Sequence, residues 1–394
     1  MSKLSNKTNR TSTARYRPTW IEVDLNAIKY NFLKIRKSVS KDTAILVPVK
    51  ANAYGHGILE VATELVATGV DYLGVGTTDE GVFLRKKGFK VGILMLGSII
   101  PLEIEAIVKY NITQAVGDIG LARKINSYCK KYDKRQKVHI EIDIGMGRIG
   151  IWHEDAIDLI KAISKLKYID VEGVFTHFSS ADEDETLTNK QIDDFKRLID
   201  KIEDNNLDIR YKHMANSTAS IDYKRSHLNL IRPGLMVYGL YPKEAKSNSK
   251  ISLRPALSLK SRVVFIKEVP PGRRISYGGT YTTKSYTDIA TIPIGYGDGL
   301  NRNLSNIGSV LINKKRAPIV GRICMDQIMV DLGKDSKVKI ADEVVLIGSQ
   351  GSKTISIEEI ADTCKTIPYE VVCWFDKRIP YKYTPCKKIA LFQK

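Results

Sequence analysis

Cysteine is scarce in this chain, and its few residues show no pattern of pairing or metal binding. The five cysteines form an odd set without the close, repeated spacing of metal ligands: Cys129, Cys324, Cys364, Cys373 and Cys386. Disulfides persist mainly in oxidising surroundings, so such a set is typical of a reducing compartment. The sequence therefore predicts no disulfide framework, no metal site and a cytoplasmic location.

Long apolar runs are also missing. No stretch approaches the ~20 consecutive apolar residues that cross a bilayer as a helix. Residues 1–19 are polar and rich in Ser and Thr, so they lack the apolar core of a secretory signal, although they superficially resemble a transit peptide. We expect no membrane partner and a disordered basic tail over residues 1–19.

Acidic residues are too few to balance the basic ones. The chain has 62 Lys and Arg against 44 Asp and Glu, which leaves a net charge of +18. Such a charge can attract nucleic acid or another anionic surface, but the sequence has no helix-turn-helix, zinc-finger or aromatic-basic strand motif. We therefore expect no nucleic-acid partner. A basic nucleic-acid-binding protein is the outside alternative, and salt-dependent binding to DNA would identify it.

Strand-like and helix-like segments alternate regularly through the first part of the chain. With 394 residues, the chain is long enough for a large domain and a smaller one. The alternation reaches eight strands by about residue 231, which predicts a (β/α)8 barrel of the TIM type. A doubly wound open sheet is the alternative, but no Gly-x-Gly-x-x-Gly follows an early strand. A strand is expected at 20–24, and the strands from the one before Lys50 onwards are expected at 44–49, 72–75, 91–96, 112–116, 137–143, 171–175, 209–213 and 229–231.

The texture of the sequence changes near residue 250. From there on, short β-rich runs such as 257–269 and 288–294 alternate with Gly and Pro turns, and only 355–364 has helical spacing. We therefore expect an α/β barrel domain over 20–247 and a mainly-β domain over 248–394.

Lys50 stands at a place where a barrel carries its chemistry. The apolar run 44–49 suits a strand buried on both faces, and Lys50 follows directly where that strand stops. The carboxyl ends of barrel strands form the rim that holds active sites. A lysine held there, partly out of water, can form a Schiff base with a carbonyl or with pyridoxal phosphate (PLP). A solvated lysine at a strand end is the plainer interpretation of Lys50 alone.

The residues around Lys50 favour the first interpretation. Val-Lys-Ala-Asn-Ala-Tyr-Gly-His-Gly, residues 49–57, resembles the PLP-lysine signature of the alanine racemases, which are fold-type III PLP enzymes. The resemblance extends, motif by motif and in order, over roughly residues 20–385. It implies that Lys50 holds PLP as an aldimine and that Tyr54 reaches the phosphate.

The segment 139–150 resembles the motif of the fifth barrel strand in this family. The resemblance implies that Arg148 touches the phenolic oxygen of PLP and the substrate. Many members carry a carbamylated lysine seven residues before this arginine, where this chain has Glu141. A carboxylate can replace the carbamate by holding Arg148 through a charge-assisted hydrogen bond, so we predict no carbamylation here.

Further motifs end the sixth, seventh and eighth strands, at 176–178, 213–217 and 230–235. Barrels often bind phosphate with the loops after strands seven and eight, where small residues let backbone N–H groups approach an anion. The resemblance assigns cofactor binding there to His177, Asn216, Ser217, Arg232, Gly234 and Leu235.

By the same resemblance, Arg232 faces the pyridine nitrogen of PLP. Arginine can only donate hydrogen bonds, so that nitrogen would stay unprotonated and the ring would be a weaker electron sink. Such a site suits removal and return of the Cα proton and disfavours transamination.

The predicted β domain carries the remaining motifs. Residues 275–281 resemble the motif of the family's second base, so Tyr277 is expected to reach the PLP of the neighbouring subunit in a homodimer. An ordinary strand tyrosine is the alternative. We hypothesise that His177 relays the field of Arg232 to Tyr277. Segments 293–299 and 321–327 match the family's substrate-binding motifs, through Tyr296, Met325 and Asp326.

One position departs from the family. Aligning residues 373–380 places Lys377 where the family usually has a tyrosine that narrows the entrance and reaches the phosphate. A lysine can still bind phosphate as a point charge, but it changes the shape and polarity of the entrance.

Together these motifs predict a PLP-dependent alanine racemase that supplies D-alanine for peptidoglycan, with Lys50 and the partner's Tyr277 as its two bases. A racemase of broader range or for serine is the alternative within the same chemistry. A PLP-carrier protein would lack the β domain, and a fold-type III decarboxylase is expected to use a cysteine and an aspartate on the partner side.

Overall fold

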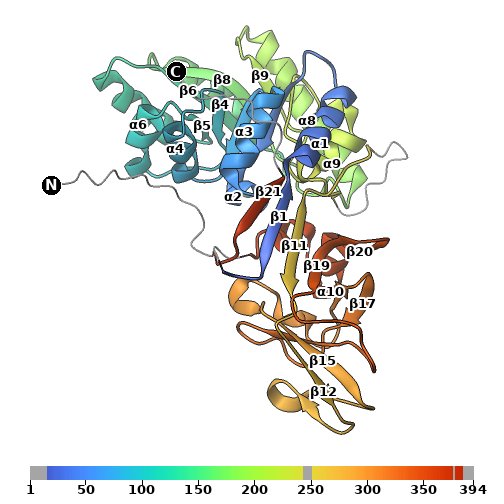
Figure 1. The fold of residues 1–394 in the computed structure, drawn as a ribbon. Coiled ribbons are helices and arrows are strands. Elements are labelled where there is room, and N and C mark those ends of the chain that lie inside the picture. Colours follow the sequence, from blue (N-terminus) through green and yellow to red (C-terminus); the bar gives the residue numbers. More distant parts are fainter. Residues whose placement is uncertain (1–15, 243–250, 376–377, 385–394) are drawn as a thin grey trace, which may run out of the picture. The chain divides into compact units, whose positions relative to one another are not determined.

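The computed structural model describes residues 16–242, 251–375 and 378–384. The chain divides into two compact units (Figure 1). Of the described residues, the barrel unit contains 25–242 and 251–254, and the β unit contains 16–24, 255–375 and 378–384. The boundary expected near residue 247 lies outside the described residues, as do residues 1–15 of the expected tail. At the end of that tail, Thr19 is buried in the β unit, with its hydroxyl bonded to Ser261 and to the carbonyl of Pro293.

The barrel unit is a closed ring of eight parallel strands. In order around the ring, β5, β4, β3, β2, β10, β9, β8 and β6 are hydrogen-bonded neighbours, and β5 also pairs with β6 to close it. A short strand, β7 (Ile151–Trp152), adds to β6. The ring strands are β2 (Ala44–Pro48), β3 (Tyr72–Val75), β4 (Gly92–Met95), β5 (Thr113–Val116), β6 (Gln136–Asp143), β8 (Ile169–Phe175), β9 (Tyr211–His213) and β10 (Leu230–Ile231). The prediction of an eight-stranded α/β barrel is confirmed.

Helices lie between the strands of the ring and bury one apolar side each. Asp184 caps α8 (Glu185–Asp204), and that helix buries Ile192, Phe195 and Leu198. Such a stripe at helical spacing packs against the barrel, and the polar side faces water. The other helices are α1 (Leu25–Ser38), α3 (Ile58–Thr68), α4 (Thr78–Lys86), α5 (Ile104–Lys109), α6 (Ile119–Lys131), α7 (Ala156–Ser164) and α9 (Ser217–Asp222).

The β unit contains a mixed sheet in the order β17-β16-β19-β11-β1-β21, with β20 beside β19. Its first strand, β1 (Trp20–Asp24), runs antiparallel to β11 (Leu257–Arg262) and parallel to β21 (Tyr381–Thr384). The remaining strands of this sheet are β16 (Ser309–Ile312), β17 (Lys315–Pro318), β19 (Glu343–Gln350) and β20 (Lys353–Ile355).

Smaller sheets complete the β unit. One joins β12 (Phe265–Val269), β15 (Thr287–Ile292) and β18 (Ile328–Asp331), and another pairs β13 (Arg274–Ile275) with β14 (Tyr281–Thr282). The helices here are short: α10 (Ile357–Cys364) and α11 (Pro368–Val371). The prediction of a mainly-β C-terminal domain is therefore confirmed.

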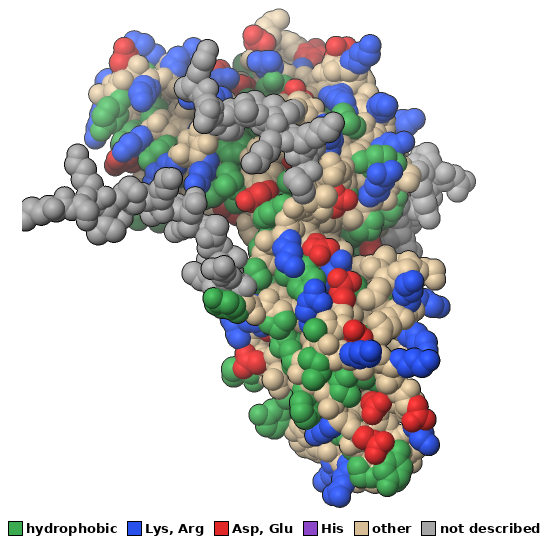
Figure 2. All heavy atoms as spheres, in the orientation of Figure 1, with side chains coloured by type: hydrophobic (Ala, Val, Ile, Leu, Met, Phe, Trp, Pro, Cys, Tyr) green, Lys and Arg blue, Asp and Glu red, His purple; other side chains and the backbone are tan. Residues whose placement is uncertain are grey.

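The surface carries charge of both signs. On the face shown in Figure 2, Lys and Arg side chains are spread over both units with Asp and Glu between them. Among the described residues, no helix has both the length and the apolar character needed to cross a membrane.

Candidate active site

The turn after β2 holds Lys50 by an unusual backbone. Lys50 begins the single turn α2 (Lys50–Tyr54), and all four residues that follow it have left-handed φ angles of 51–54°. For residues other than glycine this conformation costs about 1–2 kcal/mol each, so the surrounding contacts must enforce it. The N–H of Ala53 donates to the carbonyl of Val49 over 2.8 Å, and the N–H of Ala51 donates to Glu80 Oε1 over 2.7 Å.

Glu80 ties this turn to the neighbouring loop after β3. Its second carboxylate oxygen accepts the N–H groups of Gly76 (2.9 Å) and Thr77 (3.2 Å), which completes the capping box of α4. A Cβ on Gly76 would lie only 3.2 Å from Lys50 Cβ. The glycine therefore makes room for the lysine stem, and Lys50 is half-buried at the rim.

Tyr54, Ser217 and Gly234 meet at the ends of β2, β9 and β10. The Gly234 N–H donates to Ser217 Oγ over 2.9 Å, and a Cβ on Gly234 would lie 3.0 Å from Tyr54 Oη. The Tyr54 ring stacks on Tyr238 at 5.0 Å between centroids. Two hydroxyls and a bare backbone segment thus converge in the manner of an anion site.

Neighbouring backbone in this corner is fixed by local contacts. Asn216 caps α9 by accepting the N–H of Ala219 over 3.0 Å, so its side chain is used within the loop. Leu235 begins the buried 3-10 turn η3 (Leu235–Tyr238) directly after Gly234.

Arg232 is buried at the end of β10 and is bonded on several sides. Its guanidinium donates to His213 Nδ1 (2.7 Å), to the carbonyl of Thr176 (2.6 Å) and to the carbonyl of Met214 (3.2 Å). Burial lowers the pKa of Arg232 to about 10, so the group is still protonated at neutral pH. It is therefore a permanent donor in the barrel interior.

His177 lies beside Arg232, with 3.4 Å between its Nδ1 and Arg232 Nη2. Burial and the nearby charges of Arg232, Arg148 and Lys50 lower the pKa of His177 to about 3. The imidazole is therefore neutral, and because arginine only donates, Nδ1 is the acceptor and Nε2 carries the proton.

Glu141 and Arg148 do not form the predicted direct hydrogen bond. Glu141 lies buried on β6, and its Oε2 has no hydrogen-bond partner within the described part of the chain. Burial raises its pKa to about 7, although Arg148 and Arg232 oppose this. The prediction of a direct bond is wrong because Asp143, at the end of β6, fixes the next loop with Arg148 exposed: its carboxylate accepts the N–H groups of residues 145, 146 and 147.

The predicted residues of the β unit lie in loops that pack on one another. Tyr277 begins the turn η4 (Tyr277–Gly279) and is 69% exposed. Ser276, at φ 62°, bonds through its hydroxyl to the carbonyl of Arg322 over 2.5 Å. Gly321 has no room for a side chain, since a Cβ would lie 2.6 Å from Ser276 Cβ. The Tyr277 loop is thus held against the loop that carries Met325.

The turn η5 (Tyr296–Asp298) joins the same cluster of loops. The N–H of Tyr296 donates to the carbonyl of Cys324 over 3.0 Å, and that of Gly297 donates to the carbonyl of Met325 over 2.9 Å. Tyr296 and Met325 remain 44% and 54% exposed. Three motifs that are separate in the sequence therefore meet in space, each presenting an exposed side chain.

Three charged residues that the sequence did not single out, Arg17, Asp298 and Arg378, brace this cluster. Asp298 is fully buried and pairs with Arg17 over 2.6 Å, while Arg378 bonds to Asp326 over 2.6 Å. The acid within Gly-Tyr-Gly-Asp-Gly was the available signal for Asp298, but its partner Arg17 is far away in the sequence. Lys377 lies outside the described residues.

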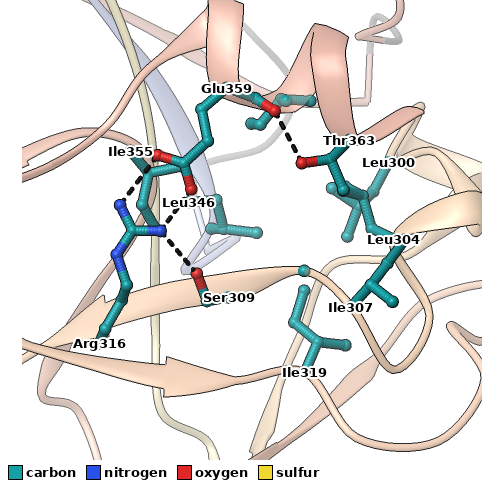
Figure 3. A pocket seen from close by; sticks show the side chains of 12 residues that line it. Leu300, Leu304, Ile307, Ser309, Arg316, Ile319, Leu346, Ile355, Glu359 and Thr363 are labelled. Carbon is teal, nitrogen blue, oxygen red and sulfur yellow. Dashed lines mark hydrogen bonds and ion pairs between the residues drawn. The ribbon is translucent and has the colours of Figure 1, made fainter. Parts of the chain in front are cut away.

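A metal site or a pocket away from the residues described above would be another candidate site. Within the described part of the chain, no group of three or more His, Cys, Asp or Glu is arranged to hold a metal ion. A pocket in the β unit lies beside the Arg316–Glu359 ion pair and is otherwise lined mainly by apolar side chains such as Leu304 and Ile319 (Figure 3).

Comparison with known proteins covers both units. Family models match the chain as "Alanine racemase, N-terminal domain" over residues 23–242 and as "Alanine racemase, C-terminal domain" over residues 256–383. The alanine racemases of Halothermothrix orenii and Methanococcus maripaludis are 45% and 43% identical over 368 residues, which is 93% of this chain and 97% and 98% of theirs.

Solved structures agree with the sequence relatives. The alanine racemase of Clostridium difficile 630 matches with a TM-score of 0.90 at 41% identity, covering 94% of this chain and 96% of that one. The alanine racemase of Bacillus anthracis with bound L-Ala-P matches with a TM-score of 0.86 at 36% identity, covering 95% and 97%. The chain therefore belongs to the alanine racemase family of isomerases.

Proposed function

We propose that this chain interconverts L-alanine and D-alanine with PLP as its cofactor, as a homodimer in the cytoplasm, and supplies D-alanine for peptidoglycan. The observation that carries the proposal is the arrangement at the barrel rim: Lys50 and an anion-binding corner stand in the same unit as a buried, permanently protonated Arg232. The related proteins are named alanine racemases, which supports alanine as the substrate.

The residues of the rim fit this cofactor. A phosphate accepts hydrogen bonds, and the hydroxyls of Tyr54 and Ser217 and the backbone of Gly234 and Leu235 would supply them. Lys50 would bind the aldehyde end of the cofactor, Arg232 would donate to the ring nitrogen, and Arg148, His177 and Asn216 would line the ring. Lys377 would add a point charge near the phosphate.

When bound, PLP withdraws electrons from the amino acid and makes its Cα proton acidic. Arg232 keeps its own proton, because its pKa of about 10 lies well above neutral pH. Arg232 would therefore donate a hydrogen bond to the ring nitrogen without giving up its proton. This favours return of the substrate proton to Cα over transamination.

Two bases on opposite faces of the substrate would move the proton. Lys50 Nζ removes or returns it on one face, and Tyr277 Oη of the partner subunit does so on the other. Tyr277 is exposed on its own unit, which is what a residue serving a second copy requires. Neutral His177 would link Tyr277 to Arg232.

The partner's loops would also bind the substrate. The backbone N–H of Met325 would meet the substrate carboxylate, with Tyr296 and Asp326 at the entrance and Arg148 on the barrel side. A serine racemase or one of broader range is the second candidate, because the alignment of residues 373–380 puts Lys377 where the family usually has an entrance tyrosine.

Chiral analysis tests the proposal directly. The purified, PLP-loaded protein is incubated separately with L-alanine, L-serine and L-lysine, and both enantiomers are quantified over time. We expect alanine to be racemised fastest. Faster conversion of serine or lysine would keep the chemistry and replace the substrate, and no conversion of any amino acid would contradict the proposal.

A further inference from the structure

A buried chain of hydrogen bonds leads from Arg232 through the interior of the barrel. Arg232 Nη1 lies 2.7 Å from His213 Nδ1, and His213 Nε2 lies 2.8 Å from His139 Nδ1. His139 Nε2 in turn lies 3.3 Å from Glu172 Oε2. All four side chains are at most 5% exposed. The chain thus crosses from the end of β10 through β9 and β6 to β8.

The two ends of this chain fix the direction of every bond in it. Arginine can only donate, so His213 Nδ1 must accept and His213 Nε2 must carry the proton. His139 Nδ1 therefore accepts, and its Nε2 carries the proton that is donated to the Glu172 carboxylate. Burial lowers the pKa of both histidines, which keeps both rings neutral, with one donor and one acceptor each.

Glu172 is the anion that anchors the far end. It also accepts hydrogen bonds from Tyr72 Oη (2.6 Å) and from Lys137 Nζ. Burial alone would raise its pKa, but the hydrogen bonds from His139, Lys137 and Tyr72 outweigh burial and hold the pKa at about 2. Lys137 is 44% exposed near the start of β6, so the chain reaches solvent at the pole opposite the rim.

We propose that Glu172 is a positioning residue for Arg232, acting through the tautomers of His139 and His213. An ionised Glu172 admits only the Nε2–H form of His139, which admits only the Nε2–H form of His213, which leaves Nδ1 free to accept from Arg232. Without the carboxylate, His139 can carry its proton on Nδ1 and face His213 as a donor. His213 must then protonate Nδ1, which points a donor at Arg232 and displaces the guanidinium. This inference rests on the proposed role of Arg232 opposite the cofactor ring.

The tautomers can be measured without cofactor or turnover. The chain has six histidines, so long-range 1H–15N spectra of the histidine-labelled protein are simple enough to assign by single substitution. We expect Nε2–H for His139 and His213 in the wild type, and the opposite Nδ1–H form for His56, whose Nδ1 donates to the carbonyl of Tyr54 over 2.7 Å. An Nδ1–H form of His213 in the wild type overturns the proposal.

Two variants of Glu172 separate its charge and acceptor from simple packing. Glu172→Leu removes the acceptor, and we expect mixed tautomers of His139 and His213 together with a fall in kcat of about tenfold or more, while KM for alanine changes less. Glu172→Gln keeps an oxygen that can accept from His139, so it should retain the wild-type tautomers and lie closer to the wild-type kcat.

Gln114→Leu is the matched control. Gln114 is also a fully buried polar residue of a barrel strand, on β5. It donates to the carbonyls of Gly97 and Ala115 and takes no part in the hydrogen bonds from Arg232 to Glu172. Its loss should lower stability without changing either tautomer. Unchanged tautomers in Glu172→Leu would refute the positioning role, and this result would leave the proposed racemase activity untouched.

Discussion

The two units hold their predicted site residues in opposite ways. In the barrel unit, the predicted residues are tied into their own unit: Arg232 is buried and bonded to three neighbours, and Lys50 follows β2 into a strained turn. In the β unit, Tyr277, Tyr296 and Met325 are exposed, although the loops beneath them are firmly braced. The predicted residues of the barrel unit are thus fixed by contacts inside that unit, whereas those of the β unit are presented to its surroundings.

Replacing Lys50 should have the largest effect, because Lys50 is the proposed cofactor-binding residue and one of the two proposed bases. We expect Lys50→Ala to lower racemisation about a thousandfold or more, since a nucleophile and a base are lost together. Racemisation of L-alanine is measured by chiral chromatography. Lys90→Ala is the control, as Lys90 is an exposed lysine of the same unit. Near-normal activity of Lys50→Ala would contradict the assignment.

Tyr277→Phe tests the exposed residues of the β unit. We expect a loss of about 10²–10⁴ in kcat, the usual contribution of a general acid or base, with cofactor binding and thermal stability unchanged. Absorbance of bound PLP and a melting curve check the last two. Tyr286→Phe, which alters another exposed tyrosine of the β unit, should leave all three unchanged. Loss of bound PLP in Tyr277→Phe would contradict the proposal that the barrel unit binds the cofactor and that Tyr277 acts only as a base.

Glu141 should make the barrel half sensitive to pH. Its pKa is raised from 4.5 to about 7 in the folded chain, so the folded state binds more protons than the unfolded state between these values. Stability from this group is therefore full below pH 4.5 and is lost as the pH rises to 7, by about 3 kcal/mol.

The comparison of Glu141→Gln with the wild type isolates this effect. Urea unfolding should show the variant gaining on the wild type from pH 5 to pH 8. Glu172→Gln is the control, because the pKa of Glu172 is shifted in the opposite direction, down to about 2. The contribution of Glu172 to the free energy of unfolding is therefore constant between pH 5 and pH 8. A pH-independent difference for Glu141→Gln would contradict the raised pKa.

The smallest change is expected from Gly234→Ala. The new Cβ would lie 3.0 Å from Tyr54 Oη, so the hydroxyl must move away from the proposed phosphate corner. We expect PLP to bind about tenfold more weakly, which is ~1.4 kcal/mol. Titration of PLP into the stripped protein measures this. Gly97→Ala is the control, since its Cβ would meet its nearest atom at an ordinary 3.5 Å. Equal affinities would argue against this corner.

The fold was largely predictable, because alternating strand and helix patterns are local properties of the sequence. The pairing of β1 was not, since the run Trp20–Asp24 reads as a strand but does not say which strands flank it. The left-handed turn was also hidden, because Ala51–Tyr54 contains no glycine to announce positive φ.

Within the candidate site, the sequence motifs single out residues but do not fix the contacts between them. The direct Glu141–Arg148 bond was a wrong inference from the family resemblance, because the loop conformation set by Asp143 decides where Arg148 points. Glu172 was missed for a similar reason: its link to Arg232 runs through His139 and His213, and no local pattern connects these four positions.

The placement of β1 has a consequence for how the chain is made. β1 leaves the ribosome before the barrel unit, yet its neighbour β11 follows only after that unit, and its other neighbour β21 follows later still. At typical rates of synthesis, β1 waits on the order of ten seconds or more for its first partner. The barrel unit can therefore be complete while the β unit is still a single unpaired strand, and a truncated product of translation would retain the first and lack the second.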